Sequence, residues 1–469
     1  LGLVGSGNNG GDALVLLRTL AARGRPVRAI LVGERSDGDA LLHGWDIART
    51  PDTALGDDPA AWDRALAGAA VLVDGLLGTG LSGAPRARQA TAIAAMNRSE
   101  RPVVSLDVPT GIDSDTGAVP GDAVRARVTV AFGFPKLGSL LHPARERVGR
   151  LVAVEIGFPP LPDPHVEGFP FGATLITPAW AAARRPRRGG ETHKNRVGAL
   201  LLLAGSEGMA GAAVLAARAA FRAGVGLLRV VSAPENRGIL QTAVPEAIFL
   251  DRTDPEALVR ALAASDAVVA GPGMGTDDEA VAALRVLLDS DVPLLLDADA
   301  LNLMGSGRVP PAAEIARGRP LLLTPHPGEM ARISSFSGDE LASGRARIAR
   351  EVATECGCAL LLKGAPSLVA SPSGPLLVDT VGSSDLATAG MGDVLSGIAG
   401  SFLAQGCVPV EAAALGLYHG GSAAALAGKG SGLVPSDVVE RLPEVLLAEG
   451  CGATELGCAG VTFDQDAPR

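Results

Sequence analysis

The chain has 469 residues, too many for one compact core, and the usual size of roughly 100–200 residues per domain predicts two or three domains. Its composition, 47% hydrophobic and 20% charged, is typical of a globular protein and excludes a wholly disordered one. The formal net charge of −10 argues against non-specific binding to nucleic acid, and no apolar run reaches the roughly 18 residues that cross a bilayer. We therefore expect neither a nucleic-acid partner nor a membrane partner.

The five cysteines show no spacing typical of a metal site or of paired disulfides. We interpret them as the reduced thiols of a cytoplasmic protein. Because the sequence begins at Leu1, directly in a strand-like run and without a methionine, we expect that an N-terminal segment is missing. We also expect the protein to form a homo-oligomer.

The first half of the sequence alternates short apolar runs with Ala-rich helical segments. After the first of these runs, Gly5–Gly11 is predicted to form a glycine-rich loop and Asp12–Arg23 an amphipathic helix. This alternation is typical of a parallel sheet covered by helices. The predicted strands are Leu1–Val4, Val27–Val32, Val71–Gly75, Val103–Val108, Val128–Phe132 and Leu151–Ile156.

The loop after the first strand satisfies the pattern G-x-G-x-x-G, from Gly5 to Gly10, and Glu34 follows the next strand, where a ribose-binding acid is expected. A dinucleotide site of the Rossmann type and a tight turn without a ligand both explain this pattern. The adjacent Asn8 and Asn9 are not needed for a pyrophosphate turn. Their carboxamide oxygens can instead bind a hard cation or a ligand.

Two more polar loops follow predicted strands of the same sheet. One begins at Asp74 and contains Gly78-Thr79-Gly80, and the other begins at Asp107 and runs to Asp113. Each aspartate alone is more often a turn or cap residue. Because ligands of open α/β sheets bind at the carboxyl ends of the strands, we expect Asn9, Asp74 and Asp107 to converge there.

The middle of the sequence predicts a linker. Phe158–Pro164 is dense in proline, and Arg184–Gly190 is basic and rich in glycine and proline. We predict a first domain over residues 1–168, a second over 172–449, and an unstructured tail over 450–469.

The second half restarts the alternation of strands and helices, and no repeat of about 20–50 residues is present. The predicted strands are Val197–Ala204, Leu227–Ser232, Ala267–Ala270, Leu294–Leu296, Leu321–Leu323 and Ala359–Leu362. The predicted helices are Gly211–Ala223, Asp393–Gln405 and Val410–Gly428.

Short polar motifs stand at the ends of these strands, where one crevice could gather them. Taken alone, His326 is equally well a substrate contact or a hydrogen-bonded loop residue, and Glu329 is a candidate cap of the next helix. Asp297 and Asp299 could hold a Mg²⁺-bound phosphate or merely cap a turn. The motifs are Thr192-His193-Lys194, Gly205–Ala212, Gly271–Gly275, Asp297–Asn302, Thr324–Glu329 and Lys363-Gly364.

The stretch Gly382–Gly397 combines a Gly- and Ser-rich loop with an apolar helix pattern, and Asp393 stands where the loop becomes the helix. A helix N-terminus presents unpaired N–H groups and a partial positive charge, which suit a phosphate. Asp393 could act there as a base beside the phosphate, or it could simply cap the helix.

The three loops of the first half, in this order, resemble the hydrated-NAD(P)H epimerase domain, over Leu1 to about Gly157. The resemblance implies a K⁺ site formed by Asn9, Asp74 and Thr110, and it implies that Asp107 is the catalytic carboxylate and a substrate contact. The other residues implied to hold the substrate are Asn8, Asn9, Gly10, Gly11, Asp12, Gly78, Thr79, Gly80, Leu81, Ser82, Gly83 and Ala84.

The motifs of the second half resemble the ribokinase-like fold and, within it, the ADP- or ATP-dependent hydrated-NAD(P)H dehydratase, over Thr174 to Glu449. By this resemblance the hydrate substrate contacts Ala212, Gly275, His326 and Asp393, and Asp393 is catalytic. The residues implied to bind the adenine nucleotide are Lys363, Gly364, Ala365, Pro366, Ser367 and Gly392.

Together the two resemblances imply a Rossmann-like three-layer domain followed by a ribokinase-like α/β domain. The implied protein is a bifunctional repair enzyme that interconverts the R and S forms of hydrated NADH and NADPH (NADHX and NADPHX). It would dehydrate the S form with ADP and Mg²⁺, and its epimerase domain would use K⁺. The alternative is a ribokinase-like vitamin or sugar kinase whose first domain binds a ligand without catalysis.

Overall fold

The structure, a computed structural model, describes residues 1–36, 39–45, 47–81, 83–159, 172–187, 197–448 and 461–465. These residues form two compact units, one containing the described residues up to 159 together with 461–465, and the other containing those from 172 to 448. The predicted domain boundary and the motif Thr192-His193-Lys194 lie outside the described residues, so the bounds 1–168 and 172–449 stay predictions. In the part of the chain that is described, no helix is long and apolar enough to cross a membrane.

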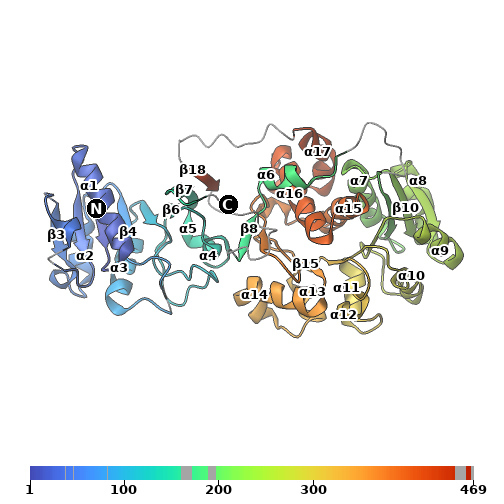
Figure 1. The fold of residues 1–469 in the computed structure, drawn as a ribbon, viewed down its shortest axis with the longest axis horizontal. Helices are drawn as coiled ribbons and strands as arrows, with labels where there is room; N and C mark the ends of the chain where they lie inside the picture. The colour runs from blue at the N-terminus through green and yellow to red at the C-terminus, as the bar shows by residue number, and fades with distance from the viewer. Residues whose placement is uncertain are drawn as a thin grey trace. The chain divides into compact units, whose positions relative to one another are not determined.

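The first unit is built on a sheet with the strand order β18-β7-β6-β5-β4-β1-β2-β3 (Figure 1). All neighbours pair in parallel except β18 and β7, which are antiparallel. The strands are β1 (Gly2–Val4), β2 (Arg28–Leu31), β3 (Ala48–Pro51), β4 (Leu72–Gly75), β5 (Val103–Leu106), β6 (Val128–Phe132), β7 (Arg150–Val154) and β18 (Val461–Gln465). The helices are α1 (Asn8–Ala22), α2 (Pro59–Leu66), α3 (Ala87–Arg98), α4 (Leu137–Leu140) and α5 (Arg145–Val148).

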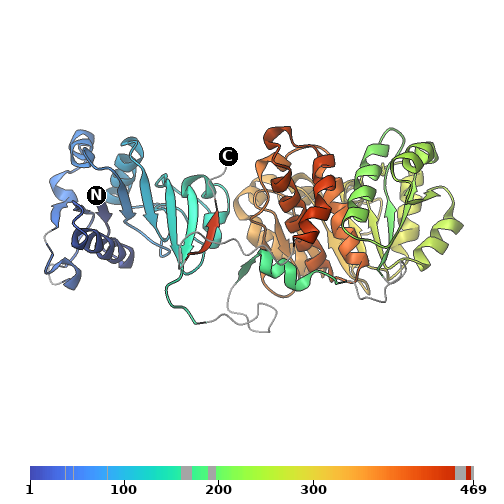
Figure 2. The same cartoon turned by 90° about the horizontal axis from the view of Figure 1, so that it is seen from above.

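Helices cover both faces of this sheet. Leu14 and Leu17 of α1 pack in one buried cluster with Val4, while Trp62 of α2 and Ile93 of α3 pack in a second cluster. Figure 2 shows α1, in dark blue, on the other side of the sheet from the lighter blue α2 and α3. The two clusters establish the predicted three-layer arrangement of the first unit.

Strand β18 corrects the prediction of an unstructured tail for residues 461–465. It pairs with β7, and Arg150 Nε donates a hydrogen bond to Asp464 Oδ1 at 2.7 Å. Val461, Thr462 and Phe463 favour a strand, but a segment this short depends on pairing with its neighbour for stability, so the sequence alone did not predict it. The rest of 449–469 lies outside the described residues.

The second unit contains a larger sheet with the strand order β11-β10-β9-β12-β13-β14-β15-β16-β17-β8. Its neighbours are parallel except that β16 runs antiparallel to both β15 and β17. The strands are β8 (Ala173–Leu175), β9 (Ala199–Leu203), β10 (Leu227–Ser232), β11 (Ile248–Asp251), β12 (Ala267–Ala270), β13 (Leu294–Leu296), β14 (Leu321–Leu323), β15 (Ala359–Leu362), β16 (Leu368–Ala370) and β17 (Leu376–Val378).

Helices also cover both faces of the second sheet, with α7, α15, α16 and α17 above it and α10, α11, α13 and α14 below it in Figure 1. The helices of this unit are α6 (Pro178–Arg184), α7 (Ala210–Arg222), α8 (Arg237–Ala243), α9 (Pro255–Ala263), α10 (Asp278–Leu288), α11 (Ala298–Gly305), α12 (Ala312–Ile315), α13 (Pro327–Ile333), α14 (Gly338–Cys356), α15 (Met391–Ala404), α16 (Pro409–Ala427) and α17 (Pro435–Leu447).

Helix α15 approaches both α7 and the sheet closely because its facing residues are glycines. A Cβ atom on Gly397 would lie 2.2 Å from the carbonyl oxygen of Ala216, and one on Gly400 would lie 2.2 Å from Val269 Cγ2. Backbone packing at this distance leaves no room for a side chain. It fixes the N-terminal turn of α15, which carries Asp393, relative to strand β12.

Two candidate active sites

In the first unit, α1 starts at Asn8 rather than at the predicted Asp12, with Gly7 as its N-cap and no side-chain capping bond. Its glycines serve close packing, since a Cβ on Gly10 would lie only 1.9 Å from the carbonyl oxygen of Gly5. The segment Asn8–Gly11 is therefore the first turn of a helix. Gly11 N donates to the Gly7 carbonyl at 3.2 Å, whereas the N–H groups of Asn8, Asn9 and Gly10 precede any helical carbonyl that could accept them. Such a turn at the carboxyl end of β1 suits an anionic group.

The three predicted K⁺ ligands lie together beside this turn. Asp74 is fully buried and accepts hydrogen bonds from Thr110 Oγ1 at 2.7 Å, Thr110 N at 2.8 Å and Ser105 Oγ at 2.8 Å. Asn9 Nδ2 donates to the carbonyl oxygen of Leu77 at 2.8 Å, and Leu77 N donates to Thr110 Oγ1 at 3.0 Å. Burial raises the pKa of Asp74, and the donated hydrogen bonds oppose this shift.

The oxygen Asn9 Oδ1 is buried and has no hydrogen-bond partner among the described residues. A buried acceptor without a partner is unfavourable unless a donor or a cation satisfies it. Carboxamide, hydroxyl and carboxylate oxygens from Asn9, Thr110 and Asp74 are the hard ligands that an alkali cation prefers. The residues at this position therefore fit K⁺.

Asp107 lies at the end of β5 with φ of +65°, a left-handed conformation that is uncommon for a residue other than glycine. Its Oδ1 accepts hydrogen bonds from Phe132 N at 3.1 Å and from Lys136 Nζ, and Lys136 also donates to the carbonyl oxygen of Phe132 at 3.0 Å. Lys136 was not among the predicted site residues. Its signal was the scarcity of lysine, since two of the four lysines, Lys136 and Lys363, pair with a carboxylate at a predicted site.

The other predicted substrate residues are brought together only in part. Burial, and then the charge of Asp107, raise the pKa of Asp12, so these two carboxylates act on each other. A Cβ on Gly78 would lie 3.5 Å from Asn9 Cβ. The described contacts do not join the loop beyond it to Asn9. Thr79 instead accepts a hydrogen bond at its carbonyl from Ser114 Oγ at 3.4 Å, and Ala84 packs beside Gly121. Between β4 and α3 also lie Gly80, Leu81 and Gly83, whereas Ser82 lies outside the described residues.

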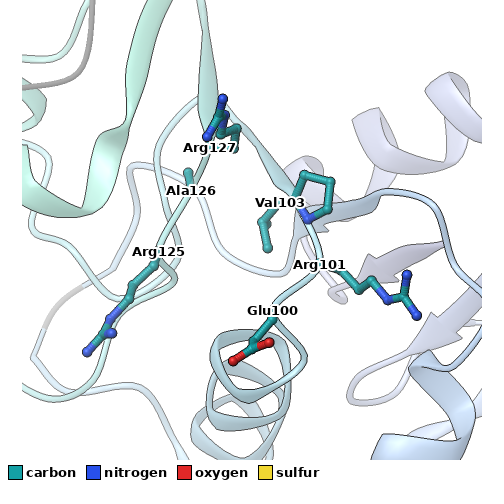
Figure 3. Close-up of a pocket in the computed structure, with 7 residues that line it drawn as sticks. Glu100, Arg101, Val103, Arg125, Ala126 and Arg127 are labelled. Atoms are coloured by element: carbon teal, nitrogen blue, oxygen red, sulfur yellow. The ribbon is translucent and has the colours of Figure 1, made fainter.

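A hollow of about 380 Å³ also opens in the first unit, but it lies at the amino ends of β5 and β6, away from Asp107 (Figure 3). Arg101, Arg125 and Arg127 line it together with Glu100. In Figure 3 the three guanidinium groups point away from one another. They do not form a common anion site, and we assign no function to this hollow.

In the second unit, Asp393 lies in the first turn of α15, whose N-cap is Gly390 with φ of +92°. No side chain caps this helix, so Asp393 does not have the capping role that the sequence left open. Burial, and then the charge of Asp297, raise the pKa of Asp393 to about 6, while Lys363 opposes the shift and Asp299 adds to it. A carboxylate with such a pKa can accept a proton near neutral pH.

A buried network surrounds Asp393. Asp297, which is 1% exposed, accepts hydrogen bonds from Lys363 Nζ at 2.5 Å and from Ser396 Oγ at 2.6 Å. A Cβ on Gly392 would lie 3.3 Å from Lys363 Nζ, so the ammonium group is held beside the turn that carries Asp393. Lys363 therefore reaches from the predicted nucleotide loop to the turn that carries Asp393.

The predicted substrate residues Gly275 and Ala212 connect to the same region. Gly275 N donates to Asp299 Oδ2 at 2.9 Å, and Asn302 Nδ2 donates to Asp299 Oδ1 at 3.2 Å. A Cβ on Gly273 would lie 2.9 Å from Ala212 Cβ. The loop Gly271–Gly275 thus packs between the start of α7 and the residues around Asp299.

His326 has a structural role in addition to any contact with a substrate. Its Nδ1 accepts hydrogen bonds from Gly328 N at 3.0 Å and Glu329 N at 3.3 Å, while His326 N donates to Glu329 Oε2 at 2.8 Å. This capping box starts α13 and bears out the interpretation of Glu329 as a cap. The side chain of His326 remains 50% exposed. The preceding residue, Pro325, accepts a hydrogen bond from Lys363 N at 2.9 Å through its carbonyl oxygen.

The predicted nucleotide loop follows β15. Ser367 Oγ donates to the Gly364 carbonyl at 3.1 Å, and Asp379 N donates to the Ser367 carbonyl at 3.0 Å. Ala365 and Pro366 lie between them, joined by a cis peptide bond. These contacts link the loop to the end of β17 and to the segment that leads into α15.

A magnesium site formed by protein ligands alone does not fit these residues. Among the described residues, no cluster of three or more His, Cys, Asp and Glu side chains could hold a metal ion. Mg²⁺ in phosphate-transfer sites is commonly held through the phosphates of the nucleotide, which needs few protein ligands.

Known proteins match both units. Residues 1–138 match the family model described as YjeF-related protein N-terminus, and residues 200–444 match the one described as NAD(P)H-hydrate dehydratase. The bifunctional NAD(P)H-hydrate repair enzyme Nnr of Moorella thermoacetica is 36% identical over 467 residues, covering 94% of this chain and 86% of the relative. The chain belongs to the family of bifunctional NAD(P)H-hydrate repair enzymes. Its membership favours repair over the alternative of a vitamin or sugar kinase.

Two crystal structures resemble the second unit. The ADP/ATP-dependent NAD(P)H-hydrate dehydratase from Bacillus subtilis, co-crystallised with ATP and Mg²⁺, is 31% identical with a TM-score of 0.51, covering 58% of this chain and 97% of that chain. A ribokinase-like superfamily protein from Enterococcus faecalis is 24% identical with a TM-score of 0.55, covering 61% of this chain and 99% of that chain. The ribokinase-like fold predicted for this half of the repair enzyme is thereby confirmed.

Proposed function

We propose that this chain restores hydrated nicotinamide dinucleotides. The first unit interconverts the R and S forms of NADHX and NADPHX, and the second unit dehydrates the S form with ADP and Mg²⁺. The observation that carries the proposal is the position of Asp393. It lies beside Lys363 and Asp297 in the first turn of α15, a helix that has no side-chain cap. The kinship with an enzyme crystallised with ATP and Mg²⁺ supports a nucleotide at this turn.

Dehydration needs the loss of a ring hydroxyl, which is a poor leaving group. Asp393 accepts the proton of this hydroxyl while its oxygen attacks the terminal phosphorus of ADP, so that AMP leaves and the ring carries a phosphate ester. The lone pair of the ring nitrogen then expels phosphate, and loss of a ring proton restores the reduced nicotinamide. The Lys363 ammonium and the N–H groups of α15 are placed to stabilise charge on the transferred group, and Mg²⁺ would screen the remaining phosphate charge.

The first unit supplies the epimer that the second unit consumes. Asp107, whose Oδ1 accepts a hydrogen bond from Lys136 Nζ, exchanges protons with the hydrate, and the turn Asn8–Gly11 holds phosphate. A K⁺ ion bound by Asn9, Asp74 and Thr110 would satisfy the buried Asn9 Oδ1 and tie this turn to the neighbouring loops.

The free thiols of Cys356, Cys358 and Cys407 support a cytoplasmic location, and the homo-oligomeric state remains a prediction.

The return of reduced-nicotinamide absorbance tests this function. Purified wild-type chain with NADHX, Mg²⁺ and ADP should restore it, parallel reactions with ATP should identify the preferred donor, and Asp393→Asn should abolish it. A wild-type rate in Asp393→Asn would refute the assigned base. Net phosphorylation of the substrate without recovery of NADH would instead indicate a kinase.

A further inference from the structure

The long helix α14 is broken at Gly344, whose φ of −134° and ψ of 28° are not helical. The next residue, Arg345, turns its guanidinium toward the loop after β15. Its Nη2 donates to the carbonyl oxygen of Lys363 at 3.1 Å, and its Nη1 donates to that of Ala365 at 3.2 Å. Arg345, 18 residues before Lys363, thus binds the carbonyl oxygens on both sides of Gly364.

A residue larger than glycine at position 364 would have to displace the Arg345 guanidinium. Gly364 has φ of +152°, and a Cβ there would lie 2.1 Å from Arg345 Nη2. The guanidinium therefore occupies the space that any larger residue at 364 would need. This fit links the break in α14 to the shape of the predicted nucleotide loop.

The charge of Arg345 is not neutralised within the described part of the chain. Its hydrogen bonds there go to carbonyl oxygens, no carboxylate forms an ion pair with it, and its Nε is buried without a partner. Burial lowers the pKa of this guanidinium, which reflects the unfavourable desolvation of the cation. Arg345 as a whole is partly buried, so solvent screens some of its charge, and an approaching anion would compensate the rest.

We propose that Arg345 is a positioning residue for the nucleotide: it holds the Lys363–Ser367 loop in its binding form and places positive charge behind it. The inference rests on the proposed function, in which this loop binds ADP. Lys363 is then fixed at both ends, through its carbonyl by Arg345 and through its ammonium by Asp297. Loss of Arg345 mainly weakens the binding of the nucleotide, because the Lys363 ammonium keeps its hydrogen bond to Asp297.

Three variants of α14 test this role. Arg345→Gln removes the charge and most of the donor fork, and Arg345→Lys keeps the charge but cannot reach two carbonyls in the same way. Arg347→Gln is the matched control, because Arg347 is exposed on the same helix and pairs with Glu351 at 2.7 Å. For each variant, calorimetry gives the Kd for ADP, steady-state kinetics give both KM values and kcat, and thermal melting reports folding.

We expect Arg345→Gln to raise the Kd and the KM for ADP about tenfold, which corresponds to about 1.4 kcal/mol, with a KM for the hydrate within about twofold of wild type. Arg345→Lys should recover part of this loss, and Arg347→Gln should match the wild type. A folded Arg345→Gln with wild-type affinity for ADP would overturn the inference, and so would an equal loss for ADP and the hydrate. If Arg345→Gln does not fold, the same comparison made with a folded Arg345→Lys decides.

The proposed function and this inference can fail separately. If the wild type binds ADP but restores no NADH, the proposed function fails, and the Kd values still decide the role of Arg345. A wild type that binds no adenine nucleotide would overturn both.

Discussion

The raised pKa of Asp393 predicts that this carboxylate destabilises the second unit at neutral pH. Its pKa moves from 3.8 to about 6, mainly because of burial and then because of the charge of Asp297. Each pKa unit corresponds to about 1.4 kcal/mol, so the ionised side chain lowers the free energy of unfolding by at most about 3 kcal/mol. Asp393→Asn, which is neutral at every pH, should therefore stabilise this unit.

The sign of the effect defines a pH window. Because the folded state binds the proton of Asp393 more tightly than the unfolded state, the destabilisation is fully present above about pH 6. It is relieved as the pH falls from about 6 toward 3.8. Asp393→Asn should thus be more stable than wild type at pH 8, and the difference should vanish near pH 4.

Tryptophan fluorescence can follow the second unit alone. Trp180 lies in the core of this unit, whereas Trp45 and Trp62 lie in the first unit, so Trp45→Phe and Trp62→Phe leave one reporter. Urea unfolding at several pH values is then compared between this background and the same background with Asp393→Asn. Asp385→Asn, at a partly exposed acid of the preceding 3-10 turn Ser384–Leu386, serves as the control for a generic charge change.

The outcome at pH 8 decides the prediction. If Asp393→Asn is more stable than wild type at pH 8 and its dehydration rate falls about 10²–10⁴-fold, Asp393 is a catalytic base whose ionised form lowers the free energy of unfolding. Equal stability of wild type and Asp393→Asn at pH 8 and pH 4 would refute the reasoning, since the ionised carboxylate would then not be strained by its surroundings.

Three further predictions concern the partners of the two carboxylates and the cation. Lys136→Met removes the ammonium group from Asp107, and epimerisation should fall at least about tenfold while the dehydration of the S form stays at the wild-type rate. Asn9→Ala removes the buried oxygen, so KCl should no longer raise the melting temperature or the epimerisation rate, both compared with NaCl. Asp297→Asn removes the charge that helps to raise the pKa of Asp393, so the acidic limb of the dehydration pH profile should move below about 6. An unchanged limb in a folded, active variant would contradict that effect.

The parallel strands could be predicted from sequence because each is a buried apolar run with its own local signal. The predicted ranges for β10, β12, β13, β14 and β15 match the structure residue for residue. Strands β3, β8, β11, β16, β17 and β18 were not predicted. Strand β18 exists through its pairing with β7. Strands β16 and β17 follow β15 as antiparallel neighbours without an intervening helix, so they break the alternation of strand and helix on which the prediction rested.

The candidate sites follow the same division. The loops could be found from sequence, because polar residues after buried strands meet at one edge of a sheet. The side-chain partners within each site could not be predicted, because they come from different segments of the chain. Lys136 meets the Asp107 carboxylate, and Asp297 meets the Lys363 ammonium, only in the folded structure. The start of α1 at Asn8 was missed because glycines that permit close packing have the same sequence pattern as a flexible loop.

The most direct test of the account follows a mixture of both NADHX epimers with ADP and Mg²⁺, after correction for spontaneous interconversion. The wild type should convert both epimers to NADH, and Asp107→Asn should consume the S form and leave the R form. Failure of the wild type to restore NADH, or consumption of both epimers by Asp107→Asn at the wild-type rate, would contradict the coupling of two active sites in one chain.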